Sequence, residues 1–352
     1  MSSTQQADTR RSDRMMTVTR LYGIGDVRCG TEPVPLPGDG EELVRVTAVG
    51  LCGSDVHWFT EAGIGDARLV RPLVPGHEFA GVIEGGPRHG VPVAVDPALP
   101  CLRCNICLRG DQNLCPEVVF AGHSDRDGGL QEYLAWPSWA LHPLPDGFSA
   151  ADGAMLEPLG VALHALDLGH LRMGAVVAII GAGPIGLLLL QAVRRAGATR
   201  VVVVEPLPHR RDAALRYGAD AVLDVDEASD DTTLTDATGP TGADVAFELA
   251  GNDQAGEFAM RAARPGARVV LVGIPDEDRT AFPASLARRK GLTLVLVRRM
   301  NDAYPRAIRL VEQGLIDVSS VVTHRFPLDS VAEAFVTAAG RKGLKVVVEP
   351  GG

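Results

Sequence analysis

The sequence predicts an α/β protein of two domains, in which a strand-rich domain is combined with a doubly wound parallel sheet. Three observations support this prediction. The chain has 352 residues, which is enough for two domains of ordinary size. Its first part consists of short β-type runs broken by glycine and proline. Its later part alternates apolar strands with helices.

Composition and charge exclude several classes of protein. The formal net charge of −10 would repel nucleic acid and anionic lipid. No apolar run is as long as a membrane span, and the first sixteen residues lack the apolar core of a secretory signal. We therefore expect a cytoplasmic protein with a disordered tail at 1–16 and reduced cysteines, with no nucleic-acid or membrane partner.

Residues 17–160 are expected to form most of the strand-rich domain. The runs ELVRVTAVG, EFAGVIEGG and VPVAVDP are separated by turn residues, which is typical of a barrel or sandwich. The tail after Arg298 contains two helical stretches and the closing strand KVVVE. We expect this tail, residues 298–352, to return to the first domain.

Residues 161–297 are expected to form the second domain. VVAII at 176–180 and VVVVE at 201–205 begin a series that DVAFELAG, ARVVLVG and LTLVLV continue, with helical stretches between them. Uniformly apolar strands that alternate with helices predict a parallel sheet covered on both faces.

The loop GAGPIG follows the first of these strands and opens a helix, which is the context of a dinucleotide-binding Rossmann domain. The first glycine permits the tight turn, the second lets the backbone approach a pyrophosphate, and the third allows the helix to pack closely on the strand. We expect the cofactor to bind Gly181, Gly183, Pro184, Ile185 and Gly186.

Glu205 ends the next strand and predicts the choice of cofactor. A carboxylate there accepts hydrogen bonds from the ribose hydroxyls and repels a 2′-phosphate, so NAD is favoured over NADP. Arg210 is also expected at the cofactor. With Arg211 it keeps NADP open as the second choice, because an arginine there could receive a 2′-phosphate.

Four cysteines fall within fifteen residues with the spacing C-x2-C-x2-C-x7-C. Four thiolates form a closed, tetrahedral zinc site with no position for a substrate. A structural zinc is therefore predicted at Cys101, Cys104, Cys107 and Cys115.

A second group mixes thiol, imidazole and carboxylate, the combination expected of a catalytic zinc with an open position. The motifs are VGLCGSDVHWF, VPGHEFAGVI and LEPLGVALHA. Their candidate residues are Cys52, Ser54, Asp55, His57, His77, Glu78 and Glu157.

Taken together and in this order, GLCGSDVH, PGHEFAG, the cysteine quartet, EPLGVALHA and GAGPIG resemble the zinc-dependent medium-chain alcohol dehydrogenases from Thr17 onward. The chain is most similar to the polyol (sorbitol/xylitol) dehydrogenase branch. Glu157 stands where the classical enzymes have a second cysteine, and Arg299 matches the branch's substrate-side arginine. Two features depart from the branch. Met300 stands in place of a tyrosine, and some polyol dehydrogenases lack the cysteine quartet.

The resemblance implies a GroES-like β-barrel catalytic domain with an inserted Rossmann domain, two zinc ions per chain, and a homodimer or homotetramer. It implies that Cys52 and His77 bind the catalytic zinc, with Glu78 as a further ligand and Glu157 bound directly or through water. It also implies that Ser54 and His57 relay the hydroxyl proton through the cofactor ribose. Substrate contacts are expected at Trp58, Glu132 and Arg299.

The expected function is oxidation of a secondary alcohol of a polyol, cyclitol or sugar-like substrate to a ketone, with hydride transfer to NAD. Three alternatives within the same class are a cyclitol or aminocyclitol dehydrogenase of specialised metabolism, a threonine dehydrogenase-like enzyme, and an NADP-linked carbonyl reductase. A zinc-stapled binding module without activity is the alternative from another class. The substrate itself is left open by the sequence.

Overall fold

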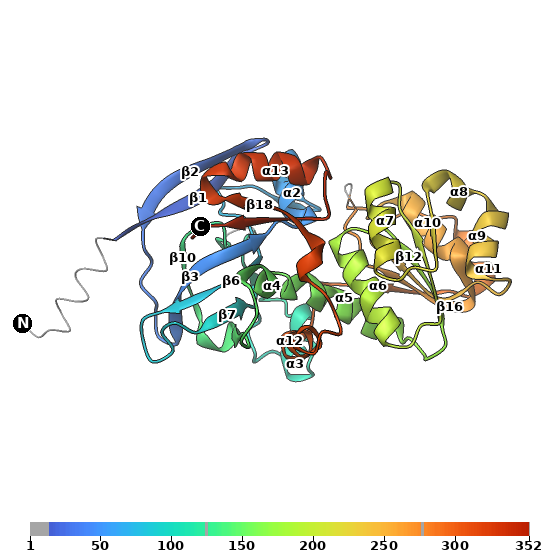
Figure 1. Ribbon diagram of the computed structural model, residues 1–352, viewed down its shortest axis with the longest axis horizontal. Coiled ribbons are helices and arrows are strands. Elements are labelled where there is room, and N and C mark those ends of the chain that lie inside the picture. Colours follow the sequence, from blue (N-terminus) through green and yellow to red (C-terminus); the bar gives the residue numbers. More distant parts are fainter. Residues whose placement is uncertain (1–13, 124–125, 276–277, 352) are drawn as a thin grey trace, which may run out of the picture. The chain divides into compact units, whose positions relative to one another are not determined.

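A computed structural model describes residues 14–123, 126–275 and 278–351 (Figure 1). The chain divides into two compact units, which are described separately. Unit 1 takes the chain up to Glu157 and again from Val322, and unit 2 runs from Pro158 to Val321. Of the expected tail, residues 1–13 lie outside the described residues, and Met15 and Met16 already belong to the first strand. No helix among the described residues has the length and apolar character needed to span a membrane.

Unit 1 is built on a seven-stranded sheet with the order β11-β7-β6-β3-β19-β18, and β10 also pairs with β3. The strand β3 is its centre, because it pairs antiparallel with β6, β10 and the closing strand β19. The strands are β3 (Glu41–Gly50), β6 (Glu78–Glu84), β7 (Pro92–Val95), β10 (Tyr133–Pro137), β11 (Leu141–Pro143), β18 (Val322–Pro327) and β19 (Lys345–Glu349).

Three two-stranded sheets and several short helices complete unit 1. The sheets pair β1 (Met15–Gly23) with β2 (Asp26–Pro33), β4 (Gly63–Ile64) with β5 (Ala67–Arg68), and β8 (Ala98–Leu99) with β9 (Val119–Phe120). The helices are α2 (Gly53–Glu61), α3 (Asn105–Leu108), α4 (Ala150–Ala154) and α13 (Val331–Ala339), with the 3-10 turns η1 (Gln112–Leu114), η2 (Ser138–Ala140) and η4 (Leu328–Ser330). The strand-rich character of the first unit is thus confirmed. Among the described strands, the seven-stranded sheet ends at β11 on one side and at β18 on the other.

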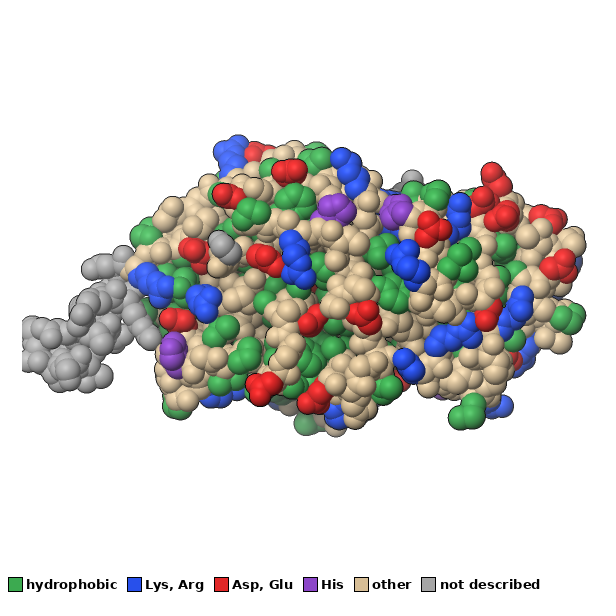
Figure 2. Space-filling view, in the orientation of Figure 1, with side chains coloured by type: hydrophobic (Ala, Val, Ile, Leu, Met, Phe, Trp, Pro, Cys, Tyr) green, Lys and Arg blue, Asp and Glu red, His purple; other side chains and the backbone are tan. Residues whose placement is uncertain are grey.

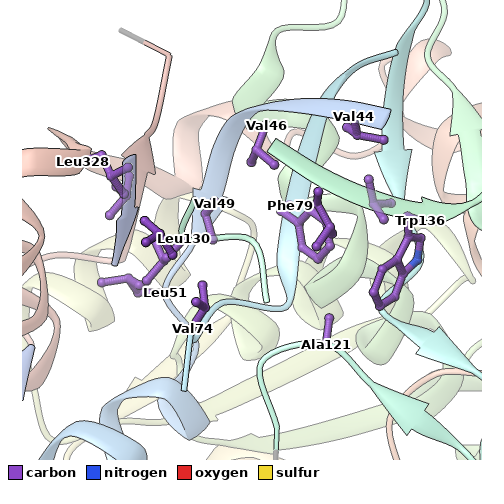
Figure 3. Packing of buried hydrophobic residues seen from close by; sticks show 14 of the residues in the cluster. Val44, Val46, Val49, Leu51, Val74, Phe79, Ala121, Leu130, Trp136 and Leu328 are labelled. Carbon is purple, nitrogen blue, oxygen red and sulfur yellow. The ribbon is translucent and has the colours of Figure 1, made fainter. Parts of the chain in front are cut away.

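The core of unit 1 packs against this sheet. Val44, Val46 and Val49 of β3 face the same interior as Phe79 of β6 and Trp136 of β10 (Figure 3). The rings of Phe79 and Trp136 meet edge to face at 6.3 Å, an arrangement that aromatic quadrupoles favour. The indole N–H of Trp136 donates to a backbone carbonyl at 2.8 Å, so its burial leaves no polar group unsatisfied.

Unit 2 is a six-stranded parallel sheet with the order β14-β13-β12-β15-β16-β17. The first strand, β12, is therefore central, and the strand order reverses between β12 and β15. The strands are β12 (Val176–Ile180), β13 (Arg200–Val204), β14 (Ala221–Leu223), β15 (Ala243–Glu248), β16 (Ala263–Leu271) and β17 (Thr293–Leu296). This confirms the predicted parallel sheet, with β12 at the predicted residues.

Helices connect the strands of unit 2, and the order of elements alternates strand with helix as predicted (Figure 1). They are α5 (Leu156–Gly169), α6 (Pro184–Arg195), α7 (Pro208–Arg216), α8 (Val225–Ser229), α9 (Asp231–Thr238), α10 (Asp253–Ala262), α11 (Ala284–Lys290) and α12 (Tyr304–Glu312), with the 3-10 turn η3 (Ser319–Val321). Acidic and basic side chains lie interspersed over the face seen in Figure 2.

The return of the chain to unit 1 differs from the expected position. The sequence placed it at residue 298, whereas residues 298–321 group with unit 2. Side chains of this segment are tied to the helices of unit 2. Arg306 forms a two-pronged ion pair with Asp167 of α5, at 2.9 and 2.6 Å. The backbone of Asp317 exchanges two hydrogen bonds with Gln191 of α6. These contacts explain why the boundary falls just before β18.

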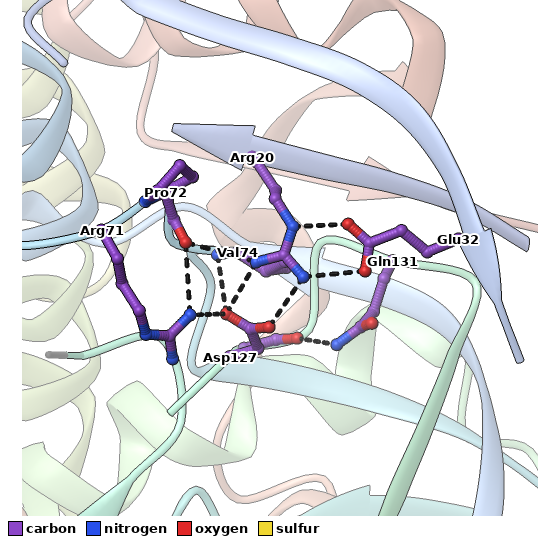
Figure 4. A network of polar contacts seen from close by, with 8 residues as sticks. Arg20, Glu32, Arg71, Pro72, Val74, Asp127 and Gln131 are labelled. Carbon is purple, nitrogen blue, oxygen red and sulfur yellow. Dashed lines mark hydrogen bonds and ion pairs between the residues drawn. The ribbon is translucent and has the colours of Figure 1, made fainter. Parts of the chain in front are cut away.

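A polar network joins strand β1 to two loops of unit 1 (Figure 4). Arg20 pairs with Glu32 at 2.8 Å and with Asp127 at 3.0 Å. Asp127 also accepts from the backbone N–H of Val74 at 3.2 Å and lies 3.5 Å from Arg71. Arg20 lowers the pKa of Glu32, although burial acts in the opposite direction. The network anchors the segment that leads into His77.

We expect Asp127→Ala to lower the free energy of unfolding by about 1–3 kcal/mol, because a buried N–H and an arginine lose their acceptor. Urea denaturation of the variant and wild type measures the loss. The matched control is Asp26→Ala, which removes an exposed carboxylate paired with Arg28 and should leave stability unchanged. Equal losses in the two variants would contradict the anchoring role.

Candidate metal sites and glycine loop

The cysteine quartet is gathered into one cluster by a short helix and two turns of unit 1. The sulfur atoms of Cys101, Cys104, Cys107 and Cys115 all lie within 4.8 Å of one another. Cys104 caps the first turn of α3, where its sulfur accepts the backbone N–H of Cys107 at 3.4 Å. The sulfur of Cys115 accepts the N–H of Cys101 at 3.3 Å. The local spacing therefore places four donors around one point.

This geometry fits a tetrahedral zinc. Four Zn–S bonds of ordinary length place the sulfurs about 3.8 Å apart. The sulfurs of Cys101 and Cys107 are separated by 4.0 Å. Two of these thiols, Cys101 and Cys107, differ in acidity. Backbone N–H donors lower the pKa of Cys101 to about 7, whereas burial raises that of Cys107 to about 12. Metal binding must release these protons, because thiolates are the ligands.

The mixed set also comes together in unit 1. Cys52 precedes α2, His77 precedes β6, and Glu78 is the first residue of β6. One ligand atom from each of the three lies within 4.8 Å of the other two. A thiol, an imidazole and a carboxylate at such distances fit a zinc ion that keeps a further position open.

Asp55 holds this set in place. It is fully buried, and its two oxygens accept the backbone N–H groups of Cys52 at 2.9 Å and Gly76 at 3.0 Å. It also lies 3.6 Å from Nδ1 of His77, which leaves Nε2 as the nitrogen that can face a metal. Burial opposes ionisation of Asp55, but the charge of His77 and the N–H donors keep its pKa below the usual range.

Glu78 forms a second buried contact, an ion pair with Lys345 at the start of β19. The two side chains are 1% and 2% exposed, so neither charge is screened by water. Gly50 makes room for the pair, because a Cβ at that position would fall on Glu78 and lie 2.9 Å from Lys345. Burial lowers the pKa of Lys345, but Glu78 and Cys52 raise it above its usual value.

Glu157 lies beside this set without belonging to the group of mutually close ligand atoms. It is 4% exposed, and burial raises its pKa to about 7, with a further contribution from the charge of Glu78. The charge of His77 acts in the opposite direction, which places Glu157 within electrostatic reach of both residues. Whether it contacts a metal stays a prediction.

The predicted relay residues lie on α2. Ser54 is half-buried in the first turn, two residues after Cys52. Nδ1 of His57, one turn on, lies 3.0 Å from a carboxylate oxygen of Glu61. The side chain of His57 is 23% exposed, so it has access to both the protein interior and water.

Two predicted substrate residues make structural contacts in unit 1, and their role at the substrate stays a prediction. Trp58 is 1% exposed and packs with Leu21 and Leu73 in a small core cluster. The carboxylate of Glu132 accepts the backbone N–H of Thr17, and its backbone bonds both Thr17 and Val46. In the sequence, Trp58 lies in VGLCGSDVHWF and Glu132 lies in GGLQEYL. Neither observation distinguishes a core position from a pocket.

Arg299, the third predicted substrate residue, lies in unit 2 with a positive φ of 56°. The next residue, Met300, is 8% exposed and packs against helix α5. A Cβ on Gly160 of that helix would fall on the sulfur of Met300. Where the polyol branch has a tyrosine, Met300 of this chain therefore packs its thioether against Gly160 within unit 2. Arg299 as a substrate contact stays a prediction.

The glycine loop in unit 2 has the geometry that a dinucleotide needs. Gly181 has a φ of 108°, which L-residues rarely adopt. A Cβ on Gly186 would fall on the carbonyl oxygen of Gly181, so the third glycine permits close packing of helix and strand. At Gly183 a Cβ would meet only Arg210, at 3.8 Å. That open space, at the N-terminus of α6, is where a pyrophosphate fits.

Glu205 and the two arginines lie around this loop. Glu205 is 3% exposed and accepts the backbone N–H groups of Ala182 at 2.8 Å and Leu207 at 3.0 Å. Arg211 is tied back, because it donates to two backbone carbonyls at 2.9 and 2.7 Å. Arg210 is the arginine that lies next to Gly183. The cofactor roles of Pro184, Ile185, Glu205 and Arg210 stay predictions.

Sequence reasoning listed Asp55 with the mixed set but gave it no role, and it did not identify two further buried charged residues, Lys345 and Glu248, as parts of these sites. Glu248 ends β15 and accepts two backbone N–H groups of the next turn at 2.6 Å. A signal was present for Lys345, which is one of only three lysines in the chain and opens its last apolar strand. For Asp55, the signal was its place at the third helical position after Cys52, which is typical of a helix cap.

Comparison with known proteins finds a matching family for each of the two units. Residues 38–146 match the family described as "Alcohol dehydrogenase GroES-like domain", and residues 184–313 match "Zinc-binding dehydrogenase". The sorbitol dehydrogenase of Bacillus subtilis is 31% identical, over 95% of this chain and 97% of the relative. The probable D-xylulose reductase A of Arthroderma otae is 36% identical, over 93% and 95%.

Solved structures show the same fold with cofactors bound. An alcohol dehydrogenase of Escherichia coli CFT073 complexed with NADH is 27% identical, with a TM-score of 0.85 over 95% of this chain and 99% of that one. A protein of Sinorhizobium meliloti 1021 bound to NADP is 30% identical, with a TM-score of 0.86 over 96% and 100%. Relatives of this fold therefore accommodate both nicotinamide cofactors.

We expect about two zinc ions per chain in purified protein, because both ligand sets fit the metal. Cys107→Ser and Cys52→Ser should each lower the content to about one. Only Cys107→Ser should also lower the melting temperature strongly, since structural zinc contributes to folding. Elemental analysis and thermal melting measure these changes. One zinc in the wild type, unchanged in Cys52→Ser, would contradict the second site.

Proposed function

Because the chain belongs to the zinc-dependent medium-chain alcohol dehydrogenases, in the branch that contains the sorbitol dehydrogenases, we propose that it is an alcohol dehydrogenase of polyol-like substrates. The proposed reaction oxidises a secondary hydroxyl of a polyol, cyclitol or sugar-like substrate to a ketone, with transfer of hydride to NAD. One observation carries the proposal. A Cys–His–Glu set with ligand atoms within 4.8 Å of one another occurs in the same chain as an open glycine loop at a helix N-terminus. Relatives named for sorbitol and D-xylulose favour a polyol substrate.

We propose that Cys52, His77 and Glu78 hold the catalytic metal, with Glu157 next to them. Zinc bound there supplies a Lewis acid for the substrate hydroxyl. The protein provides the environment for that ion. Asp55 fixes the orientation of His77, and Lys345 balances the charge of Glu78. The raised pKa of Glu157, about 7, allows it to hold or release a proton near neutral pH.

Ser54 and His57 are proposed to carry the hydroxyl proton outward. Ser54 follows Cys52 by two residues on α2, and His57 follows one turn later. A hydroxyl can accept and donate in the same step, and an imidazole exchanges protons readily near neutral pH. The partial exposure of His57 gives the proton a route to water.

The cofactor is proposed to be NAD. Glu205 is buried at the end of β13, where its carboxylate meets the loop and would repel a 2′-phosphate. Arg210 beside Gly183 is the observation that favours NADP and with it a carbonyl reductase, the second candidate.

A homodimer or homotetramer is also proposed. The edge strand β17 of unit 2 carries Leu296, which is 76% exposed. An apolar edge strand is a surface that a second chain can extend or cover. Sedimentation analysis that finds a monomer would contradict this.

All six cysteines are unpaired, so we infer a reducing, cytoplasmic location, which cell fractionation would check.

The proposed reaction is tested by an NAD-reduction screen over alditols, cyclitols, aminocyclitols and threonine. We expect turnover of at least one polyol or cyclitol. Removal of zinc with a chelator should abolish turnover and leave binding of NADH intact, because unit 2 carries the glycine loop. Steady-state kinetics and NADH fluorescence measure the two properties. A metal-free sample with full activity would refute the proposed chemistry.

The choice of cofactor is tested by Glu205→Ala. Loss of a carboxylate facing the ribose should raise the NADP-to-NAD ratio of kcat/KM about tenfold or more, since hydrogen bonds to a charged group are worth about 1.5–3 kcal/mol. Adding Arg210→Ala should remove the gain if this arginine receives the 2′-phosphate. An unchanged ratio in Glu205→Ala, at normal thermal stability, would exclude Glu205 as the selecting group.

A further inference from the structure

On helix α2, His57 lies next to Glu61, a residue outside the sequence motifs described above. Nδ1 of His57 lies 3.0 Å from Oε1 of Glu61, one helical turn further along. Glu61 is the last residue of the helix, and Ala62 after it ends the helix in the left-handed conformation, with a φ of 52°. The pair is therefore fixed at the end of the helix that begins next to Cys52.

The chemistry of the pair assigns the proton on the imidazole. A carboxylate only accepts hydrogen bonds, so Nδ1 of His57 must be the donor. In the neutral ring the lone pair then lies on Nε2. Free imidazole side chains in water favour the opposite arrangement, with the proton on Nε2. The contact with Glu61 thus selects the tautomer that histidine prefers less when it is unrestrained.

Helix stability does not account for a glutamate at this position. The side chains of His57 and Glu61 are 23% and 46% exposed, and ion pairs at such exposure add little to stability. A negative charge in the last turn also opposes the helix dipole, and α2 has no basic residue in that turn. What the contact does determine is the orientation and the tautomer of His57.

We propose that Glu61 is a positioning residue, which holds His57 in the Nδ1–H tautomer so that Nε2 accepts the proton released from the substrate hydroxyl. The inference rests on the proposed function, in which Ser54 and His57 carry this proton. Ser54 takes up the substrate's proton and gives up its own, which the relay delivers to Nε2. The ring then carries a positive charge beside the Glu61 carboxylate. It returns to neutral when water accepts one proton.

The first test needs no turnover. Nitrogen-15 NMR of the full chain distinguishes the two tautomers, and a His57→Gln sample assigns the signal among the nine histidines. We expect neutral His57 to carry its proton on Nδ1 in the wild type and mainly on Nε2 in Glu61→Ala. A wild-type ring protonated on Nε2, or an unchanged tautomer in the variant, would overturn the proposal.

The second test is a double-mutant cycle in the active enzyme. Glu61→Ala should lower kcat about 3- to 10-fold with KM unchanged, a fraction of the 10²-fold or more that general acid–base catalysis contributes. In a His57→Ala background the same change should have no effect. Glu61→Gln, whose carbonyl oxygen can still accept from Nδ1, should recover most of the activity.

The matched control is Thr60→Ala, on the same turn of α2, whose hydroxyl donates to the backbone carbonyl of Val56 at 2.9 Å. It should keep wild-type kcat. An equal loss from Glu61→Ala with and without His57 would show a merely structural role and overturn the proposal. A wild type that oxidises no alcohol refutes the proposed function, and the tautomer measurement then decides the assignment of Glu61.

Discussion

The buried carboxylate of Asp55 is the contact on which the candidate metal site depends. Its oxygens bind backbone N–H groups on two segments, one before α2 and one before β6, and it lies beside His77. A fully buried carboxylate without such donors would be strongly unfavourable. With them, it fixes the two segments that present Cys52 and His77 at one separation. The ligand positions are thus set by backbone hydrogen bonds, before any metal binds.

Charge balance explains why the end of the chain returns to the first unit. Glu78, Glu157 and Asp55 place three carboxyl groups in a region with little access to water. Lys345, at the start of the closing strand, supplies the opposing charge, and Gly50 leaves space for it. Pairing makes burial of both charges possible, whereas removal of either partner would leave the other uncompensated. The closing strand is therefore part of the site as well as part of the sheet.

Backbone geometry plays the corresponding part in unit 2. The three glycines of the loop differ in their surroundings. Gly181 has a positive φ, Gly183 faces open space, and Gly186 lies against the carbonyl of Gly181. Glu205 and Glu248 end the strands on either side of β12, and each accepts backbone N–H groups of the adjoining turns. Both carboxylates stiffen the edge of the sheet where the strand order reverses, which is where ligands bind in such folds.

Features encoded within short stretches were readable from the sequence. The strand at 176–180, the glycine loop and the cysteine quartet each depend on residues close together along the chain, so spacing and residue type were sufficient. Features that depend on distant residues required the fold. Lys345 meets Glu78 only because β19 pairs with β3, and Trp58 proved to be core because β1 and the 71–77 segment cover it. Residues 298–321 joined unit 2 through contacts with α5 and α6 that periodicity does not encode. Burial and long-range pairing are properties of the packed chain, which is why the sequence could nominate the reactive side chains and Asp55, but not the orienting role of Asp55 or the lysine that neutralises Glu78.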